Sequence, residues 1–223
     1  MKHVGIIMDG NRRWAKEKNM PASYGHKKGA ENLLKLASHI FKKGVKVLSL
    51  FAFSTENFKR SEEEVSYLME LFVEYASKYL GKLKKEGIKI VFSGSRENLS
   101  PKVLEALEKT EDTLNEGDKI LNICFNYGGR SEIIRAVKRI MASGIKVEDI
   151  NEESFKNYLD YNLPDMDLLI RTSGEMRISN FMLYQLSYAE LFFTKTYFPD
   201  FNNEEYDKIE EAYMKMRERR FGK

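Results

Sequence analysis

Short apolar runs alternate with stretches of helical periodicity along the chain. The apolar runs predict β-strands at residues 4–8, 45–53, 88–92, 120–125 and 168–170. Apolar residues that recur every three or four positions predict helices at residues 27–43, 62–86, 101–116, 131–143 and 203–220. Alternation of this kind predicts an α/β fold, in which a mostly parallel central β-sheet is flanked by helices.

Several helix ends carry local signals. Ser61 followed by Glu64 matches a capping box at a helix start. Gly44 and Gly87 stand where glycine commonly follows the end of a helix. These signals support the predicted order of elements.

The predicted helix at residues 62–86 carries an unusually long apolar stripe. Its members keep a spacing of three or four residues over six turns: Val65, Leu68, Met69, Phe72, Val73, Ala76, Tyr79 or Leu80, and Leu83. Such a stripe indicates either an ordinary core or the lining of an elongated apolar cavity. Periodicity does not separate these two interpretations.

Composition narrows the class of protein. The 223 residues are 42% hydrophobic, and 37 basic against 34 acidic side chains leave a net charge of +3. A near-balanced charge argues against a nucleic-acid partner, and the single Cys124 excludes an internal disulfide. We find no linker or repeat and no apolar run long enough for a membrane span. We therefore expect one domain over residues 1–223, in a cytoplasmic protein.

Polar clusters follow four of the predicted strands. In a parallel sheet these strand ends share one edge, where α/β proteins bind ligands. The clusters combine arginine with small or amide residues, which is typical of phosphate binding. The clusters are residues 9–13, 54–60, 126–130 and 171–177.

Asp9 is the carboxylate of the first cluster. It could cap a helix or bind a hard cation such as Mg²⁺, which needs few protein carboxylates when substrate phosphates supply oxygens. Gly10, Asn11 and Arg13 favour an anion site, because glycine exposes backbone N–H groups and arginine offers a bidentate fork. Without further information His26 is better interpreted as a structural histidine. The residues alone therefore predict an α/β enzyme that handles phosphate groups.

Long motifs in a fixed order also resemble one known family, the cis-prenyltransferases. They read HVGIIMDGNRRWAK, YGHKKGA, LFAFSTENFKRSEEEV, NICFNYGGR, DLLIRTSGEMRISNFMLYQLSYAELFF and RRFG. The resemblance implies a Mg²⁺-dependent homodimer that adds isopentenyl diphosphate in cis to farnesyl or geranylgeranyl diphosphate and makes a medium- to long-chain polyprenyl diphosphate. It also implies a hydrophobic tunnel between sheet and helices, and product release by peripheral contact with the inner face of the membrane.

The resemblance assigns roles to individual residues. Asp9 and Asn57 would be catalytic, and Asp9 would bind the metal together with Glu190, which a second subunit supplies in the resembled enzymes. The remaining matches would bind substrate: Gly10, Asn11, Arg12, Arg13, Trp14, His26, Ser54, Thr55, Glu56, Phe58, Arg60, Arg171, Arg177, Ile178, Ser179, Arg220 and Gly222.

Two departures from the family pattern bear on function. Ala22 stands where the family usually has an arginine, and Arg12 stands where bacterial members usually have glycine. Ala22 puts the binding strength and the choice of allylic primer in question, and Arg12 could partly replace the missing charge. An alternative is a non-catalytic accessory subunit of a heteromeric enzyme, but such subunits lack the metal aspartate that this chain has as Asp9.

Overall fold

The central sheet is parallel throughout, in a computed structural model that describes residues 1–113 and 115–220, the side chains of residue 80 and of residues 217–220 excepted. Its strand order is β3-β4-β2-β1-β5-β6, and each neighbouring pair runs parallel. The strands are β1 (His3–Ile7), β2 (Val47–Ser54), β3 (Ile88–Ser93), β4 (Lys119–Tyr127), β5 (Leu168–Arg171) and β6 (Glu190–Phe193).

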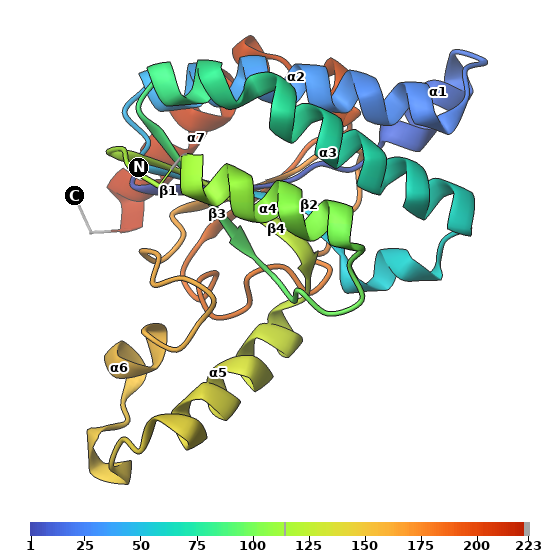
Figure 1. Cartoon of the computed structure of the whole chain (residues 1–223). Coiled ribbons are helices and arrows are strands. Elements are labelled where there is room, and N and C mark those ends of the chain that lie inside the picture. Colours follow the sequence, from blue (N-terminus) through green and yellow to red (C-terminus); the bar gives the residue numbers. More distant parts are fainter. Residues whose placement is uncertain (114, 221–223) are drawn as a thin grey trace.

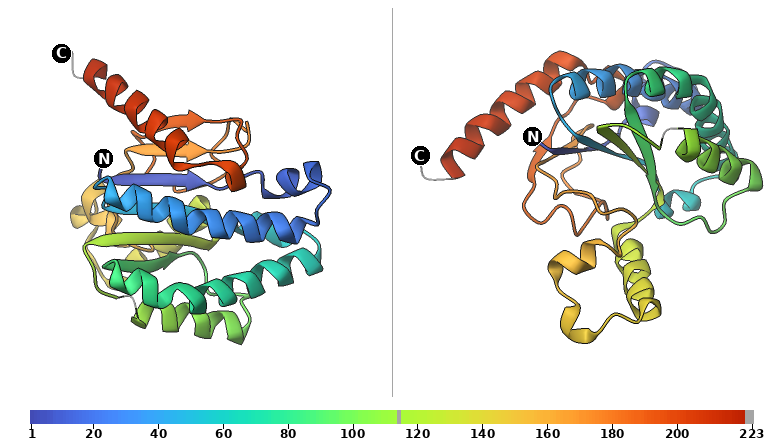
Figure 2. Two further views of the ribbon diagram at one scale, coloured as in Figure 1. Left: turned by 90° about the horizontal axis from the view of Figure 1, so that it is seen from above. Right: turned by 60° about the vertical axis from the view of Figure 1, so that its left-hand side comes forward.

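Helices α2, α3 and α4 lie over one face of the sheet, and α5 and α6 project from the other side (Figures 1 and 2). The α-helices are α1 (Asn11–Glu17), α2 (Ala22–Lys42), α3 (Glu62–Lys85), α4 (Pro101–Thr113), α5 (Gly129–Ser143), α6 (Glu152–Lys156) and α7 (Asn203–Arg220). The 3₁₀ turns are η1 (Thr55–Lys59), η2 (Val147–Asp149) and η3 (Phe198–Asp200).

The predicted fold class is confirmed, and each predicted strand and helix has a counterpart. Among the α-helices and strands, α1, α6 and β6 were not predicted. Helix α1 escaped prediction because its N-cap is Gly10, at φ 103°, which offers no side chain as a signal. The helix predicted from residue 27 begins five residues earlier, directly after Pro21, whose fixed φ suits a helix start. Gly44 and Gly87, both at positive φ, follow α2 and α3 as expected.

Strand register brings the polar clusters to one edge. Ile7 of β1 pairs with Phe51 of β2 and with Arg171 of β5, and Phe51 pairs in turn with Cys124 of β4. All these strands point the same way, so the segments that leave their carboxyl ends start side by side. The polar clusters therefore share one edge of the sheet, as predicted.

Two apolar clusters sandwich the sheet. The larger joins the sheet to α2, α3, α4 and α7, and includes Leu36, Leu50, Phe92, Leu107 and Tyr206. The smaller lies on the opposite face and includes Tyr127, Met166, Leu169, Phe181 and Met182. The segments before and after β5, at residues 161–166 and 178–186, thus cover the face that the long helices leave open.

Candidate active site

Asp9 lies at the centre of the polar edge. Its backbone N–H donates to Thr172 Oγ1 at 3.0 Å, and its carbonyl accepts the Thr172 hydroxyl at 2.7 Å. The carboxylate accepts the Gly10 N–H at 2.7 Å and Arg171 Nη2 at 2.9 Å, and its side chain is 30% exposed. Because Gly10 occupies the N-cap of α1, the carboxylate faces the polar edge and does not cap the helix.

Arg171 has a buried guanidinium that can still donate a further hydrogen bond. Only 5% of its side chain is exposed. Nη1 donates to Ser179 Oγ at 2.7 Å and to the Arg177 carbonyl, and Nη2 donates to Asp9. Nε is buried and has no hydrogen-bond partner in the described part of the chain. A buried cationic N–H without an acceptor is costly, so the site is suited to an incoming anion.

Arg13 comes from α1 and is held from several sides. Its guanidinium donates to the Ser173 carbonyl and to Glu175 Oε1, both at 3.2 Å, and also to Ser173 Oγ. It lies 5.8 Å from the centroid of the Tyr197 ring. With its side chain 42% exposed, Arg13 remains accessible to a ligand.

Glu64 collects three further basic groups. Its carboxylate lies 2.7 Å from Arg60 Nη1, 3.4 Å from Arg12 Nη1 and 3.3 Å from His26 Nε2. Burial acts to raise the pKa of Glu64, but Arg60 and Arg12 outweigh it and hold that pKa below its usual value. Burial also lowers the pKa of His26, which favours a neutral imidazole that donates to the carboxylate.

The turn after β2 is fixed by a reciprocal cap. Ser54 and Asn57 cap each other's backbone in a capping box, in which the Ser54 N–H donates to Asn57 Oδ1 at 3.1 Å. The Asn57 side-chain oxygen is therefore occupied by its own turn. Thr55 donates to Glu56, so this segment is ordered by its own side chains.

Three cavities meet at this edge. The Arg13 cavity, about 700 Å³, is lined by Asp9, Gly10, Asn11, Arg12, Arg13, Ala22, His26 and Arg60 among others. The Arg171 cavity, about 600 Å³, is lined by Asp9, Glu56, Asn57, Arg60, Arg171, Arg177, Ser179 and Asn180 among others. The third is the apolar cavity, about 180 Å³, between α2, α3 and the sheet. Met8, Asn11 and His26 line all three, so the cavities are neighbours.

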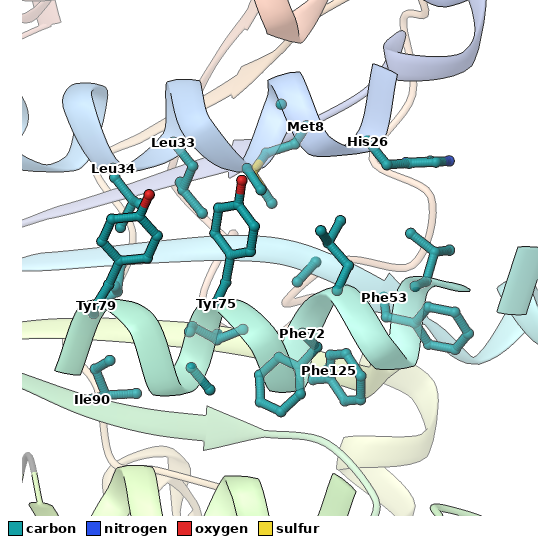
Figure 3. A pocket seen from close by; sticks show the side chains of 18 of the residues that line it. Met8, His26, Leu33, Leu34, Phe53, Phe72, Tyr75, Tyr79, Ile90 and Phe125 are labelled. Carbon is teal, nitrogen blue, oxygen red and sulfur yellow. The ribbon is translucent and has the colours of Figure 1, made fainter. Parts of the chain in front are cut away.

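The apolar cavity runs lengthwise between the two long helices (Figure 3). His26 and Phe53 mark one end, and Tyr79, Leu34 and Ile90 mark the other. The lining includes Leu68, Phe72, Ala76 and Leu83 of the α3 stripe. These members of the stripe therefore line a cavity, and most of them also pack against the core. An apolar cavity thus lies where the hydrophobic tunnel was predicted.

The polar edge fits a metal ion that is shared with a substrate. In the described residues, no group of three or more His, Cys, Asp or Glu side chains comes together as a metal cage. Asp9 offers one part-exposed carboxylate that lines both polar cavities. Mg²⁺ commonly takes one or two carboxylates, and phosphate oxygens and water complete its shell.

Within one copy of the chain, Glu190 does not lie at the polar edge beside Asp9. Glu190 opens β6 and pairs with Leu168, at the amino end of the strands, whereas Asp9 lies beyond their carboxyl end. Five residues of extended strand correspond to about 16 Å. A common metal site would therefore need the Glu190 of a second copy.

Several other predicted site residues do not line the three cavities or lie outside the described residues. Trp14 is buried and stacks on Tyr24, with 6.0 Å between ring centroids, and it does not line the three cavities. Phe58 packs edge-on against Phe53, and Ile178 packs against the smaller apolar cluster. The side chain of Arg220 and all of Gly222 lie outside the described residues.

Glu64 is a site residue that the sequence did not single out. It was interpreted only as part of a helix cap. Its backbone N–H does donate to Ser61 Oγ at 3.3 Å, but its carboxylate contacts Arg60, Arg12 and His26.

Three residues of the cluster at 171–177 were also missed. Thr172 fixes Asp9, and Ser173 and Glu175 fix Arg13. Their position directly after a predicted strand was the available signal.

The chain is similar over nearly its whole length to known proteins. Residues 7–222 match a family model described as putative undecaprenyl diphosphate synthase. An isoprenyl transferase of Fusobacterium nucleatum is 49% identical, over 99% of this chain and 95% of that protein. A tritrans,polycis-undecaprenyl-diphosphate synthase (geranylgeranyl-diphosphate specific) of Pyrococcus furiosus is 46% identical, over 100% of this chain and 87% of that protein.

Solved structures are similar in fold. A lavandulyl diphosphate synthase from Lavandula x intermedia, in complex with dimethylallyl diphosphate, has a TM-score of 0.91 at 32% identity and covers 95% of this chain and 94% of its own. A probable undecaprenyl diphosphate synthase from Campylobacter jejuni has a TM-score of 0.82 at 32% identity, with 96% and 95% covered. No helix in the described part of the chain has the length and apolar character that crossing a bilayer requires.

Proposed function

Since the chain belongs to the cis-prenyltransferase family and is a prenyltransferase enzyme, we propose that it condenses isopentenyl diphosphate in cis onto an allylic diphosphate and releases pyrophosphate. The preferred primer is farnesyl or geranylgeranyl diphosphate. One observation carries the proposal: two arginine-lined cavities share Asp9 and adjoin one apolar cavity. Two diphosphate heads and one hydrocarbon tail require this arrangement.

The two polar cavities divide the substrates between them. The Arg13 cavity, with Gly10, Asn11 and His26, would hold the allylic diphosphate, whose tail would enter the apolar cavity past His26. The Arg171 cavity would hold isopentenyl diphosphate, and the buried Nε of Arg171 would gain an acceptor there. Arginine forks suit diphosphate oxygens because both are bidentate.

Asp9 would hold Mg²⁺ against the diphosphates, and the Glu190 of a second copy is a further proposed ligand. The ion, when bound, neutralises charge on the departing pyrophosphate. Arg13 and Arg60 line the same cavity and would stabilise this charge as it develops, because their positions are already fixed by protein contacts.

The bond changes balance within the two substrates. The allylic C–O bond breaks, a new C–C bond forms from the alkene of isopentenyl diphosphate, and one proton leaves. We propose that a pyrophosphate oxygen takes the proton, since Asn57 is a neutral amide whose oxygen caps its own turn. Asn57 then orders the segment beside the reacting carbons, which must lie about 3–3.5 Å apart.

The product we propose is a medium- to long-chain polyprenyl diphosphate. Burying hydrocarbon contributes about 0.8 kcal/mol per CH₂, and noncovalent affinity reaches a ceiling of about 18–21 kcal/mol. A long product therefore cannot remain wholly and rigidly buried. We expect a cytoplasmic enzyme that releases product at the inner membrane face, with release limiting turnover. A burst of product in the first turnover tests this, and a linear onset would contradict it.

We propose that the enzyme works as a homodimer. Ile134, Val137 and Met141 are spaced along one side of α5 and are 56%, 41% and 80% exposed. α5 stands away from the body of the domain (Figure 2), and clusters of exposed apolar side chains mark interaction sites. Sedimentation should give a dimer that Val137→Glu weakens, and a monomer in both would contradict the proposal.

Incubation of the purified chain tests the function. Labelled isopentenyl diphosphate, Mg²⁺ and geranyl, farnesyl or geranylgeranyl diphosphate should give polyprenyl products without any partner protein. Asp9→Asn should lower the rate at least about 10³-fold, which is the effect expected when one electrostatic contact to the transition state is lost. Chelation of Mg²⁺ should lower the rate to a similar extent. Binding without elongation by the wild type would favour the accessory-subunit alternative.

A further inference from the structure

Asn180 joins three loops at the edge of the Arg171 cavity. Its backbone carbonyl accepts the Gly129 N–H at 2.7 Å, and its side-chain Oδ1 accepts the Arg130 N–H at 2.9 Å. Its Nδ2 donates to Glu56 Oε1 at 3.3 Å. One side chain thus connects the segments that follow β2, β4 and β5.

The backbone at this position is left-handed. Ser179 has φ 47° and Asn180 has φ 64°, a region that asparagine tolerates better than most residues. The hydroxyl of Ser179 accepts Arg171 Nη1 at 2.7 Å. The conformation of Asn180 therefore decides where the hydroxyl beside the buried guanidinium lies.

Gly128 provides the room for this junction. A Cβ at Gly128 would lie 2.7 Å from Asn180 Nδ2 and 3.0 Å from Thr55 Oγ1. The first distance is too short for a carbon contact, and the second is unusually tight. Glycine therefore lets the amide of Asn180 lie flush against the turn that carries Glu56.

Glu56 is otherwise hard to explain. It is a carboxylate that lines a cavity rich in arginine, where it would repel a diphosphate. Burial acts to raise the pKa of Glu56, but its own backbone N–H and the Asn180 amide outweigh that effect, so its pKa is below the usual value. The carboxylate is ionised and directed to Asn180, which indicates a role as the acceptor for that amide.

We propose that Asn180 is a positioning residue for isopentenyl diphosphate: by donating to Glu56 it fixes the Arg177–Ser179 loop against the Thr55–Lys59 turn. The inference rests on the proposed function of the Arg171 cavity. Asn180 acts through Arg171 and Ser179, so its loss weakens binding of one substrate rather than the chemistry.

Asn180→Asp isolates the contact with Glu56. Aspartate tolerates the left-handed backbone and keeps an oxygen for the Arg130 N–H, but it places a second negative charge against Glu56. KM for isopentenyl diphosphate should rise about tenfold, the scale of one hydrogen bond to a charged group. KM for the allylic primer and kcat should each change less than about twofold.

Glu56→Gln supplies the matched rescue. Alone it should raise the same KM about threefold, because a neutral acceptor is weaker. Combined with Asn180→Asp, it provides an amide at position 56 that can donate to the new carboxylate at position 180, and KM should return to within about threefold of wild type. A double variant no better than Asn180→Asp would overturn the proposal, as would an Asn180→Asp variant with unchanged KM.

Two readouts separate this inference from the proposed function. Calorimetry without primer should show that the affinity for isopentenyl diphosphate falls in Asn180→Asp and recovers in the double variant, as KM does. If the wild type elongates no primer, the proposed function fails, whereas an active wild type with an unaffected Asn180→Asp variant defeats only the inference. Thermal unfolding of each variant should stay close to that of the wild type, and a collapse that Glu56→Gln fails to reverse would mean that Asn180 is needed only for folding.

Discussion

The two faces of the sheet are filled in opposite ways. On the face toward α2 and α3, an apolar cavity of about 180 Å³ remains between side chains. On the other face, four buried polar residues form a continuous hydrogen-bonded chain across β1, β2, β4 and β3. The members are His3, Ser49, Asn122 and Ser93.

The direction of every bond in this polar chain is fixed. His3 Nδ1 donates to the Pro164 carbonyl at 2.7 Å, so Nε2 accepts the Ser49 hydroxyl at 2.7 Å. Asn122 donates to Ser49 at 3.0 Å and accepts the Ser93 hydroxyl at 2.8 Å. Directional bonds of this kind permit one arrangement of the strands. The cavity on the opposite face is lined mainly by apolar side chains, whose contacts are non-directional, and a hydrocarbon chain can replace those. The rigid, hydrogen-bonded face therefore holds the strand ends in place, and the face with the cavity can adapt.

The largest effect is expected from breaking the rigid face. Asn122→Leu removes two buried hydrogen bonds and leaves the Ser93 hydroxyl without its acceptor, which should lower the free energy of unfolding by about 3–4 kcal/mol. Ile123 is the next residue of β4 and lines the cavity, so Ile123→Val is the matched control and should cost about 1 kcal/mol or less. Urea unfolding measures both. Equal costs would abolish the distinction between the faces.

A second effect appears with pH. Burial lowers the pKa of His3 to about 4 from 6.5. Below pH 6.5 the unfolded chain takes up a proton that the folded chain refuses, so stability falls as the pH drops toward 4 and this contribution then levels off. The loss amounts to about 3 kcal/mol over that window. Unfolding at several pH values should show a steeper slope than in His3→Gln, and parallel slopes would mean that His3 is not held neutral.

The sequence predicted the rigid frame better than the adaptable face. The strands and the polar edge followed from apolar runs and from the residues that end them, because both depend on local chain geometry. The buried polar chain gave no signal, since Ser49 and Asn122 lie within apolar runs and become partners only through strand register. The cavity was undecided because a core and a tunnel need the same periodicity. Small residues on both helices, Ala30 of α2 and Ala76 of α3, line the cavity, and their common location is not visible in the sequence of one helix.

The sequence predicted which loops form the site, but it predicted fewer of the contacts between their side chains. Asp9, Arg13 and Arg171 were found because they follow strands. His26 was interpreted as structural on local grounds, and its contact with Glu64 depends on how α2 packs on α3. Glu190 was paired with Asp9 through resemblance to a dimeric enzyme, and one copy of the chain keeps the two apart.

Filling the cavity should change the product more than the stability. Ala76→Leu adds three carbons to a helix position that lines empty space, and leucine is nearly as good a helix former as alanine. The free energy of unfolding should change by less than about 1 kcal/mol, because overpacking is costly only where no space exists. Products should become shorter by at least one isoprene unit, which chromatography of the dephosphorylated lipids measures. Unchanged product lengths with normal activity would place the growing chain elsewhere.

The smallest effect, and one of opposite sign, concerns a single hydroxyl. Tyr75 reaches from α3 toward α2 across the cavity (Figure 3). Its hydroxyl is buried without a hydrogen-bond partner in the described residues, and burial raises the pKa of Tyr75 to about 12. Tyr75→Phe removes an unsatisfied group and keeps the ring, so stability should rise by up to about 1 kcal/mol with product length unchanged.

Tyr67 of the same helix is the matched control for Tyr75. Its hydroxyl donates to the Ser23 carbonyl of α2 at 3.1 Å, so Tyr67→Phe should cost about 1 kcal/mol. Opposite signs for two identical substitutions on one helix would distinguish an adaptable apolar wall from a hydrogen-bonded contact. If Tyr75→Phe destabilises as much as Tyr67→Phe, then the hydroxyl of Tyr75 has a partner such as bound water. The cavity would then be wetter, and less suited to a hydrocarbon chain, than its lining implies.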